Sequence, residues 1–469
     1  MLAADPTHPL CYLSSIKAQE IPLELIDVAE FGISVDSFGF YKNKTNDPDF
    51  LSKETIARNL NRIIADHYPI LVGRPKLTDN QKCAISVDPN NLNLPSVEDV
   101  YVDQPAGEFL ITLRKEKELQ FFNLKKFVDA VGMDKFPKST FHKDHSSVVI
   151  RLIRFQDNSY VGFSLCLPHV IFDGISCAMF MSNFAAYVRN EGNDDYVLPD
   201  PPINDRKIFA DYFASVTPEP LSIVKHFKED LPDLPMEFPK NPVPLLMQTP
   251  DLPLYEQQHL LHISAENLER MRQDIDPSQS TNNILMSLLL KCFSKANAET
   301  FGNPPINTYV TMAYDMRNRS GIPQNFAGNA SGALAQHIDG ERVMSSSTKQ
   351  LAQHIKNSVV EVQSGHSKSL IDIIENDVGM LYKGSIYMSN TPTAAHIFAT
   401  NLRYIPFHKA DFGTGGPDII SFFYFSREGM LRINPNRQDG GLDLFLNYAD
   451  ANFDKLRNSE LMEYADVVF

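Results

Sequence analysis

The stretch from Leu165 to Phe180, LCLPHVIFDGISCAMF, constrains the fold more than any other part of the chain. Up to Pro168, alternate apolar residues share one face of a β-strand, and proline ends it because proline lacks the N–H that pairs strands. After Gly174, apolar residues recur at helical spacing. A strand, a short turn and a helix therefore follow one another, which is typical of folds that mix helices and strands in layers.

The same mixture of elements recurs along the rest of the sequence. Residues 54–75 predict a helix that breaks at Pro69, and residues 146–155 predict a strand that a turn joins to the strand at 160–168. Further segments predict a buried helix at 281–296 and strands at 306–314, 419–426 and 441–450. The polar, proline-bearing segment 190–206 resembles a linker. We therefore expect an α/β fold of two layered lobes, each with a mixed sheet and flanking helices.

Charge and cysteine content exclude several classes of function. The 469 residues carry a formal net charge of -15, and nucleic-acid binding needs a basic surface, so we expect no nucleic-acid partner. Five cysteines at irregular spacing indicate reduced thiols rather than disulfides or a zinc site. The start, MLAADPTHPL, lacks the pattern of a signal peptide. We expect a cytoplasmic, monomeric protein with no transmembrane segment, because His169 and Asp173 interrupt the most apolar tract.

His169 and Asp173 are the first candidates for chemistry. Both are costly to bury unless they are hydrogen-bonded or paired. A histidine at a strand end is held by the rigid sheet and exposed by the turn, so it can act as a general base toward an alcohol or an amine. Asp173 could hold the turn or the ring in place. The alternative is a buried histidine whose ring bonds a backbone carbonyl, and the residues alone leave both interpretations open.

Other motifs are weaker. ADFGTGGPD at 410–418 contains the DFG of protein kinases without their HRD loop, so a structural turn around Asp411 is the favoured interpretation. Arg317, which follows the strand at 306–314, could pair with a buried carboxylate. Neither an H-E-x-x-H metal motif nor a G-x-S-x-G nucleophile motif is present, so we expect no metal and no covalent acyl-enzyme.

Taken in order, several segments make the chain resemble the BAHD acyltransferases, which use acyl-coenzyme A. The family's H-x-x-x-D-G motif stands here as HVIFDG at 169–174, and its D-F-G-W-G motif stands as DFGTG at 411–415. Four further segments are similar to family elements: IADHYPILVGRP, STNNILMSLLLKCF, YDMRNRSGIPQNFAGNA and GGLDLFLNYADANFDKL. The resemblance covers nearly the whole chain.

The resemblance implies a fold similar to chloramphenicol acetyltransferase, with an active-site channel between two lobes. We expect residues 1–205, with a returning segment near 405–436, to form the N-terminal lobe, and 206–404 plus 437–469 to form the C-terminal lobe. The implied activity moves an acyl group from an acyl-CoA thioester, the co-substrate, to a small-molecule hydroxyl or amine in secondary metabolism. No permanently bound cofactor is implied.

The resemblance also implies roles for particular residues. His169 would be the general base, and Asp173 would turn away from the substrates and pair with Arg317. A structural role is implied for Gly174 and for the turn containing Asp411, Gly413 and Gly415. Candidate contacts to coenzyme A are Arg272, Ser280 and Thr281, and the candidate acceptor pocket is near Ser34 and Ser37.

The chain departs from the family pattern in three places. Thr414 replaces the tryptophan of D-F-G-W-G, Asn283 replaces an aspartate, and FAGN replaces YFGN. These changes suggest a divergent branch. Two alternatives remain open: a condensation-type domain that uses carrier-bound thioesters, and a degenerate member that only binds ligands.

Overall fold

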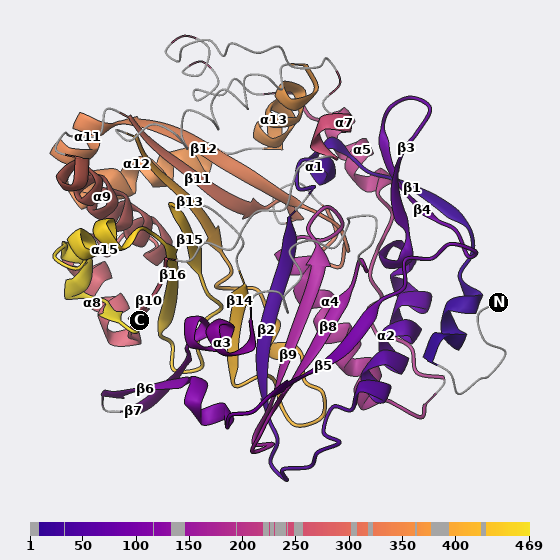
Figure 1. Ribbon diagram of the computed structural model, residues 1–469. Coiled ribbons are helices and arrows are strands. Elements are labelled where there is room, and N and C mark those ends of the chain that lie inside the picture. Colours follow the sequence, from indigo (N-terminus) through magenta and orange to yellow (C-terminus); the bar gives the residue numbers. More distant parts are fainter. Residues whose placement is uncertain are drawn as a thin grey trace.

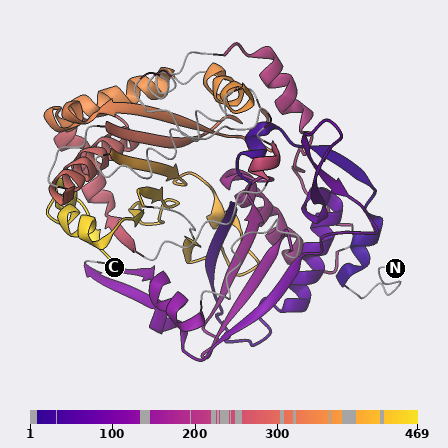
Figure 2. The same ribbon diagram turned by 45° about the horizontal axis from the view of Figure 1, so that its top comes forward.

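The structure is a computed structural model that describes residues 9–31, 33–115, 117–132, 146–193, 195–218, 225, 229, 241, 243–247, 257–301, 307–317, 322–361, 364–376, 394–423 and 428–469. Two large mixed sheets stand side by side, and helices of each sheet lie toward the outside of the molecule (Figures 1 and 2). Among the helices of the described residues, none combines the length and the apolar character needed to cross a membrane.

The first large sheet has five strands in the order β14-β2-β9-β8-β5, and of its four strand pairs only β5–β8 is parallel. One face packs against helices α2 and α4, and the other carries a phenylalanine-rich cluster with α3 and the β6–β7 hairpin. These elements are β2 (Ser34–Lys42), β5 (Ser96–Val102), β6 (Leu110–Lys115), β7 (Lys117–Phe122), β8 (Val149–Phe155), β9 (Tyr160–Pro168), β14 (Ile419–Phe423), α2 (Lys53–His67), α3 (Leu124–Val131) and α4 (Gly174–Arg189).

The second large sheet has seven strands in the order β12-β11-β13-β15-β16-β10-β17. The neighbours β11, β13 and β15 run parallel, and the other pairs are antiparallel. The long helix α9 lies at the centre of its apolar core. The elements are β10 (Gln258–Ile263), β11 (Asn307–Asp315), β12 (Ser331–Asp339), β13 (Ala394–Asn401), β15 (Met430–Ile433), β16 (Leu442–Asn447), β17 (Asp466–Val467), α8 (Ala265–Ile275), α9 (Thr281–Phe301), α11 (Gly340–Ser345), α12 (Thr348–Glu361) and α15 (Asp450–Leu456).

Smaller elements complete the described part of the chain. A three-stranded sheet has the order β1-β4-β3. The remaining elements are β1 (Gln19–Pro22), β3 (Arg74–Leu77), β4 (Cys83–Val87), α1 (Leu25–Val28), α5 (Lys207–Ser215), α7 (Val243–Leu246), α13 (Ser364–Asn376) and the 3₁₀ helices η1 (Pro9–Ser15), η2 (Pro69–Val72), η3 (Ala106–Phe109), η5 (Phe407–Lys409) and η6 (Glu460–Glu463).

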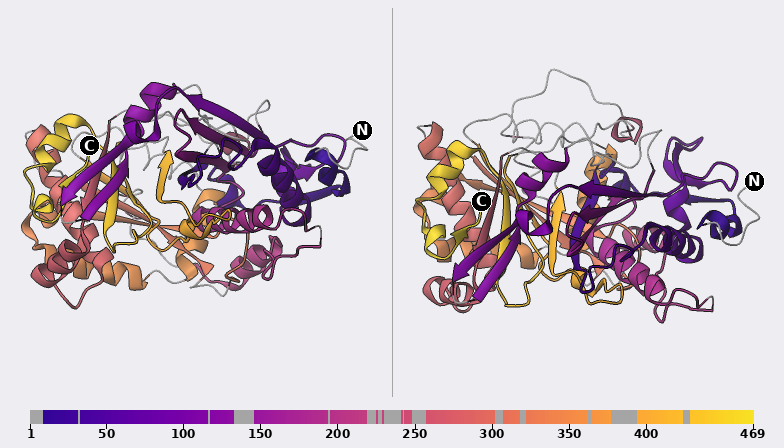
Figure 3. Two further views of the ribbon diagram at one scale, coloured as in Figure 1. Left: turned by 90° about the horizontal axis from the view of Figure 1, so that it is seen from below. Right: turned by 60° about the horizontal axis from the view of Figure 1, so that its bottom comes forward.

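Several contacts between described residues join the two large sheets. Strand β14 comes late in the chain but pairs with β2 of the first sheet. The β6–β7 hairpin extends toward the second sheet (Figure 3), where the ring of Phe121 lies 5.2 Å from that of His262 and 4.6 Å from the guanidinium of Arg437. The buried guanidinium of Arg432 stands 5.1 Å from the ring of Phe422 and 4.4 Å from that of Phe445.

These observations confirm the predicted fold class, with mixed sheets and flanking helices. The predicted helix at 54–75 is α2, which ends at His67 before Pro69 opens η2. Of the segment 405–436, β14 joins the first sheet and β15 joins the second. The lobe boundaries drawn from the sequence stay a prediction.

Candidate active site

The turn from His169 to Asp173 is held at both ends by backbone hydrogen bonds. At its start, the N–H of His169 donates to the carbonyl of Ile33 at 2.9 Å, just before β2 begins. Within it, the N–H groups of Ile171 and Phe172 both donate to the carbonyl of Pro168. At its end, Asp173 caps α4, because its Oδ1 accepts from the N–H of Ser176 at 2.8 Å. The strand and the helix therefore fix the turn.

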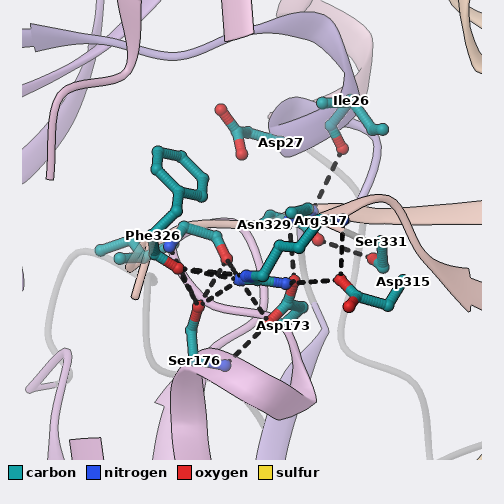
Figure 4. Close-up of polar contacts among 12 residues, drawn as sticks. Ile26, Asp27, Asp173, Ser176, Asp315, Arg317, Phe326, Asn329 and Ser331 are labelled. Carbon is teal, nitrogen blue, oxygen red and sulfur yellow. Dashed lines mark hydrogen bonds and ion pairs between the residues drawn. The ribbon is translucent and has the colours of Figure 1, made fainter. Parts of the chain in front are cut away.

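A buried ion pair anchors the carboxylate of Asp173 (Figure 4). Nη1 of Arg317 donates to its Oδ2 at 2.8 Å and Nη2 donates to its Oδ1 at 3.2 Å, and the N–H of Ala330 donates to Oδ2 at 2.7 Å. Arg317 further donates to Asp315, to the hydroxyl of Ser176 and to backbone carbonyls of the 326–328 segment. The structure thus brings together Asp173 and Arg317, which are 144 positions apart in the sequence.

The charge on Arg317 is stable in this position. Burial alone would lower the pKa of the guanidinium, but the attraction and hydrogen bonds of Asp173 and Asp315 outweigh burial and raise it above its usual value. A buried charge pair of this kind is costly to break, because the remaining partner loses both water and its counter-ion. The pair therefore locks the end of the turn.

One nitrogen of the His169 ring makes no hydrogen bond to the described part of the chain. Its Nδ1 atom is buried and has no hydrogen-bond partner among the described residues. The sequence left open a ring that bonds a backbone carbonyl, and Nδ1 makes no such bond to a described residue. The backbone of His169 is therefore fixed, while this ring nitrogen is not committed to a protein partner.

A second arginine, missed by the sequence reasoning, holds the middle of the same turn. Arg206 is buried, and its Nη2 donates to the carbonyl of Ile171 at 2.6 Å while its Nη1 pairs with Oδ1 of Asp27 at 2.9 Å. Burial raises the pKa of Asp27 to about 6, although Arg206 counteracts this. Arg206 and Arg317 both lie near the ring of Phe326, at 5.8 and 5.9 Å. No sequence pattern singled out Arg206, since it simply ends the 190–206 linker.

Packing surrounds Gly174, and backbone hydrogen bonds shape the DFGTG turn. A Cβ on Gly174, the first residue of α4, would stand 3.0 Å from Ile405. Oδ1 of Asp411 accepts from the N–H groups of Gly413 and Gly415 at 2.7 and 2.8 Å. The carbonyl of Asp411 accepts from Arg189, the last residue of α4. Because α4 has 16 residues, the DFGTG turn lies about 24 Å along the helix from the His169 turn.

The candidate contacts to coenzyme A cluster near the start of α9. Arg272 is bound in a bidentate pair with Glu269 and donates to the carbonyl of Pro277 at 2.8 Å. The hydroxyl of Ser280 accepts from the N–H of Asn283, and Thr281 is the first residue of the helix. Unpaired N–H groups at a helix N-terminus suit an anionic phosphate.

The candidate acceptor residues Ser34 and Ser37 both lie on β2, where Ser34 is opposite Pro168 and Ser37 opposite Leu165 of β9. Between them lies Asp36, which the sequence reasoning missed. This carboxylate is 5% exposed. The thiol of Cys166, opposite it on β9, is a hydrogen-bonding neighbour, and no nitrogen or oxygen donor contacts it within the described part of the chain. Burial raises its pKa to about 7.

No group of three or more metal-ligating side chains could hold a metal ion within the residues that the structure describes.

The likeness to known proteins is extensive but distant. Residues 106–461 match the family model described as Transferase family.

Hydroxycinnamoyltransferase 2 of Oryza sativa subsp. japonica is 22% identical over 87% of this chain and 86% of its own length. Putrescine hydroxycinnamoyltransferase 3 of the same plant is 25% identical, but that match spans 33% of this chain and 36% of the relative. Among solved structures, F. graminearum TRI101 complexed with coenzyme A and deoxynivalenol has a TM-score of 0.71 at 15% identity and aligns over 96% of this chain and 100% of its own. This last likeness shows a shared fold.

Proposed function

The chain belongs to the Transferase family of BAHD acyltransferases, and on that premise we propose that it transfers an acyl group from an acyl-CoA thioester to a hydroxyl or amine of a small molecule. The observation that carries the proposal is the His169 turn. A rigid strand end, two buried arginines and a helix cap hold this turn, yet one ring nitrogen of the histidine has no partner.

In the proposed reaction, a ring nitrogen of His169 takes the proton from the acceptor hydroxyl or amine as the acceptor oxygen or nitrogen attacks the thioester carbonyl. The carbonyl electron pair moves onto oxygen and forms a tetrahedral oxyanion. Collapse of this intermediate breaks the carbon–sulfur bond, and the protonated His169 returns the proton to the departing thiolate. The products are the ester or amide and free coenzyme A, and no bond to the enzyme forms.

The other residues of the turn act through geometry. Asp173 accepts from Arg317, Ser176 and Ala330, so its carboxylate is committed to protein donors rather than to a substrate. We therefore assign Asp173 and Arg317 as positioning residues. Holding reactants in a near-attack arrangement supplies much of the rate when no covalent intermediate forms.

Coenzyme A, as a substrate, would bring its phosphates to the start of α9. Ser280 and Thr281 stand where helix N–H groups favour anions. Arg272 would have to loosen its exposed pair with Glu269 to contact a phosphate, and exposed pairs of this type contribute little stability.

A thiol-release assay with a panel of acyl-CoAs and small alcohols and amines tests the proposal. We expect His169→Ala to lower turnover by about 100-fold or more, because general-base catalysis typically contributes this much. His408→Ala is the matched control, since His408 is exposed on η5, beside the remote DFGTG turn, and its loss should leave turnover unchanged. Full turnover of the folded His169→Ala protein would contradict the mechanism.

A further inference from the structure

A cavity of about 140 Å³ is lined by residues at the start of α9 and at the carboxyl ends of β11, β13 and β15. Figure 1 shows where these elements lie in the second sheet. Carboxyl ends of parallel strands are a usual place for ligands in α/β proteins. The described residues that line the cavity are Asn282, Met286, Met312, Ala313, Tyr314, Leu334, Val359, Ala399, Asn401 and Ile433.

Two lining residues of the cavity stand close in the chain to residues that contact the end of the His169 turn. The lining residue Tyr314 stands three positions before Arg317, which forms the ion pair with Asp173. The lining residue Asn401 precedes Leu402, and a side-chain methyl of Leu402 lies 3.6 Å from where a Cβ on Gly174 would stand. Both connections reach the end of the same turn, at Asp173 and Gly174, which places the cavity on the side of the second sheet that faces this turn.

The lining selects for an apolar occupant. None of the lining side chains is charged. Of the two amides, Nδ2 of Asn401 donates to Oδ1 of Asn282 at 2.9 Å, so they partly satisfy each other. A 150 Å³ cavity with apolar walls is known to hold benzene. By this standard, the cavity has room for about six carbon atoms.

We propose that this cavity receives the apolar end of the donor's acyl group and favours a chain of about six carbons or a single aromatic ring. The inference rests on the proposed function and adds the class of donor to it. The donor is chosen over the acceptor because the lining residue Asn282 directly follows Thr281, at the α9 N-terminus proposed for coenzyme A. The thioester would then lie between the helix start and His169.

Binding of unreactive CoA thioethers tests the cavity without requiring turnover. The probes are S-methyl-, S-butyl-, S-hexyl-, S-benzyl- and S-decyl-CoA, measured by isothermal titration calorimetry on the full chain. We expect affinity to rise by about four-fold for each buried methylene, which is the free energy of burying one methylene converted to a ratio. The rise should end near S-hexyl and S-benzyl, and S-decyl should bind less tightly.

Two variants change the cavity in opposite directions. Ala313→Leu, at a half-buried lining position, should fill it and weaken S-benzyl-CoA by about ten-fold or more while S-methyl-CoA binds as before. Met286→Ala should enlarge it and move the optimum to longer chains. Met271→Ala is the matched control, because Met271 is a fully buried methionine of α8 in the same core but does not line the cavity.

The outcomes separate the two proposals. If thioethers bind with an affinity that does not depend on chain length, or if Ala313→Leu and Met286→Ala both keep the natural length profile, the cavity proposal is overturned while the proposed function stands. If S-methyl-CoA itself does not bind, the proposed function fails, and the cavity proposal fails with it.

Discussion

The substitution Asp173→Asn tests how the buried ion pair holds the active-site turn. The carboxylate accepts four hydrogen bonds, two of them from Arg317 at 2.8 and 3.2 Å. An asparagine keeps one oxygen, and asparagine caps helices about as well as aspartate, so the bond from the N–H of Ser176 should survive. The new amide N–H groups would instead face the donors of Arg317 and Ala330.

The magnitude follows from these contacts. Two charge-assisted bonds from Arg317 contribute about 1.5–3 kcal/mol each, and breaking a buried pair costs about 3–5 kcal/mol. We therefore expect the free energy of unfolding to fall by about 4 kcal/mol. Turnover should fall by about 100-fold, because a shift of about 1 Å in a catalytic group has this effect.

Urea denaturation followed by far-UV circular dichroism measures the first effect, since the chain has no tryptophan for fluorescence. Asp315→Asn is the matched control. It pairs with the same arginine at 2.9 Å, but its side chain is 20% exposed, so its loss should cost only about 1 kcal/mol. Equal losses for the two variants, or a loss below about 1 kcal/mol for Asp173→Asn, would refute the reasoning.

Three further outcomes are expected. Burial raises the pKa of Asp36 to about 7, so ionisation of this carboxyl lowers the stability of the natural protein as pH rises from 4 to 7. Urea denaturation should therefore show the free energy of unfolding of Asp36→Asn rising by about 4 kcal/mol relative to the natural protein over that range, with no further change above it. Arg206→Lys keeps a positive charge for Asp27 but loses the planar guanidinium whose second nitrogen also bonds the carbonyl of Ile171. In the thiol-release assay, kcat should therefore fall about ten-fold or more while KM stays near its natural value. Gly415→Ala places an L-residue at a φ of 103°, so denaturation should show a loss of about 1–2 kcal/mol with unchanged turnover, and altered turnover would argue against a purely structural turn.

Local patterns in the sequence predicted the elements that carry the site. Pro168 ends β9, Asp173 caps α4, and the glycines of DFGTG allow Asp411 to bond their N–H groups. Each of these interactions joins residues within a few positions, so the residue types alone indicate it. The ordered motifs also predicted the family, which the match over residues 106–461 confirms.

Local patterns in the sequence could not predict contacts between distant segments. Nothing near Arg206 indicates that it reaches the carbonyl of Ile171, 35 positions earlier, or Asp27, 179 positions earlier. The pairing of Arg317 with Asp173 was expected only through a family resemblance, because no spacing rule joins residues 144 positions apart. The buried carboxylate of Asp36 was missed because an alternating strand pattern does not reveal which polar residue the packing will bury.

The sequence by itself determined the strand, the turn, the helix and the identities of the reactive groups. These depend on backbone geometry and on hydrogen bonds between near neighbours. Only the tertiary structure decided which buried charges meet, which ring nitrogen lacks a partner, and where a cavity of about 140 Å³ opens in the second sheet. The physical reason is that burial and charge pairing depend on every element packed around a group, and packing exists only once distant segments have come together.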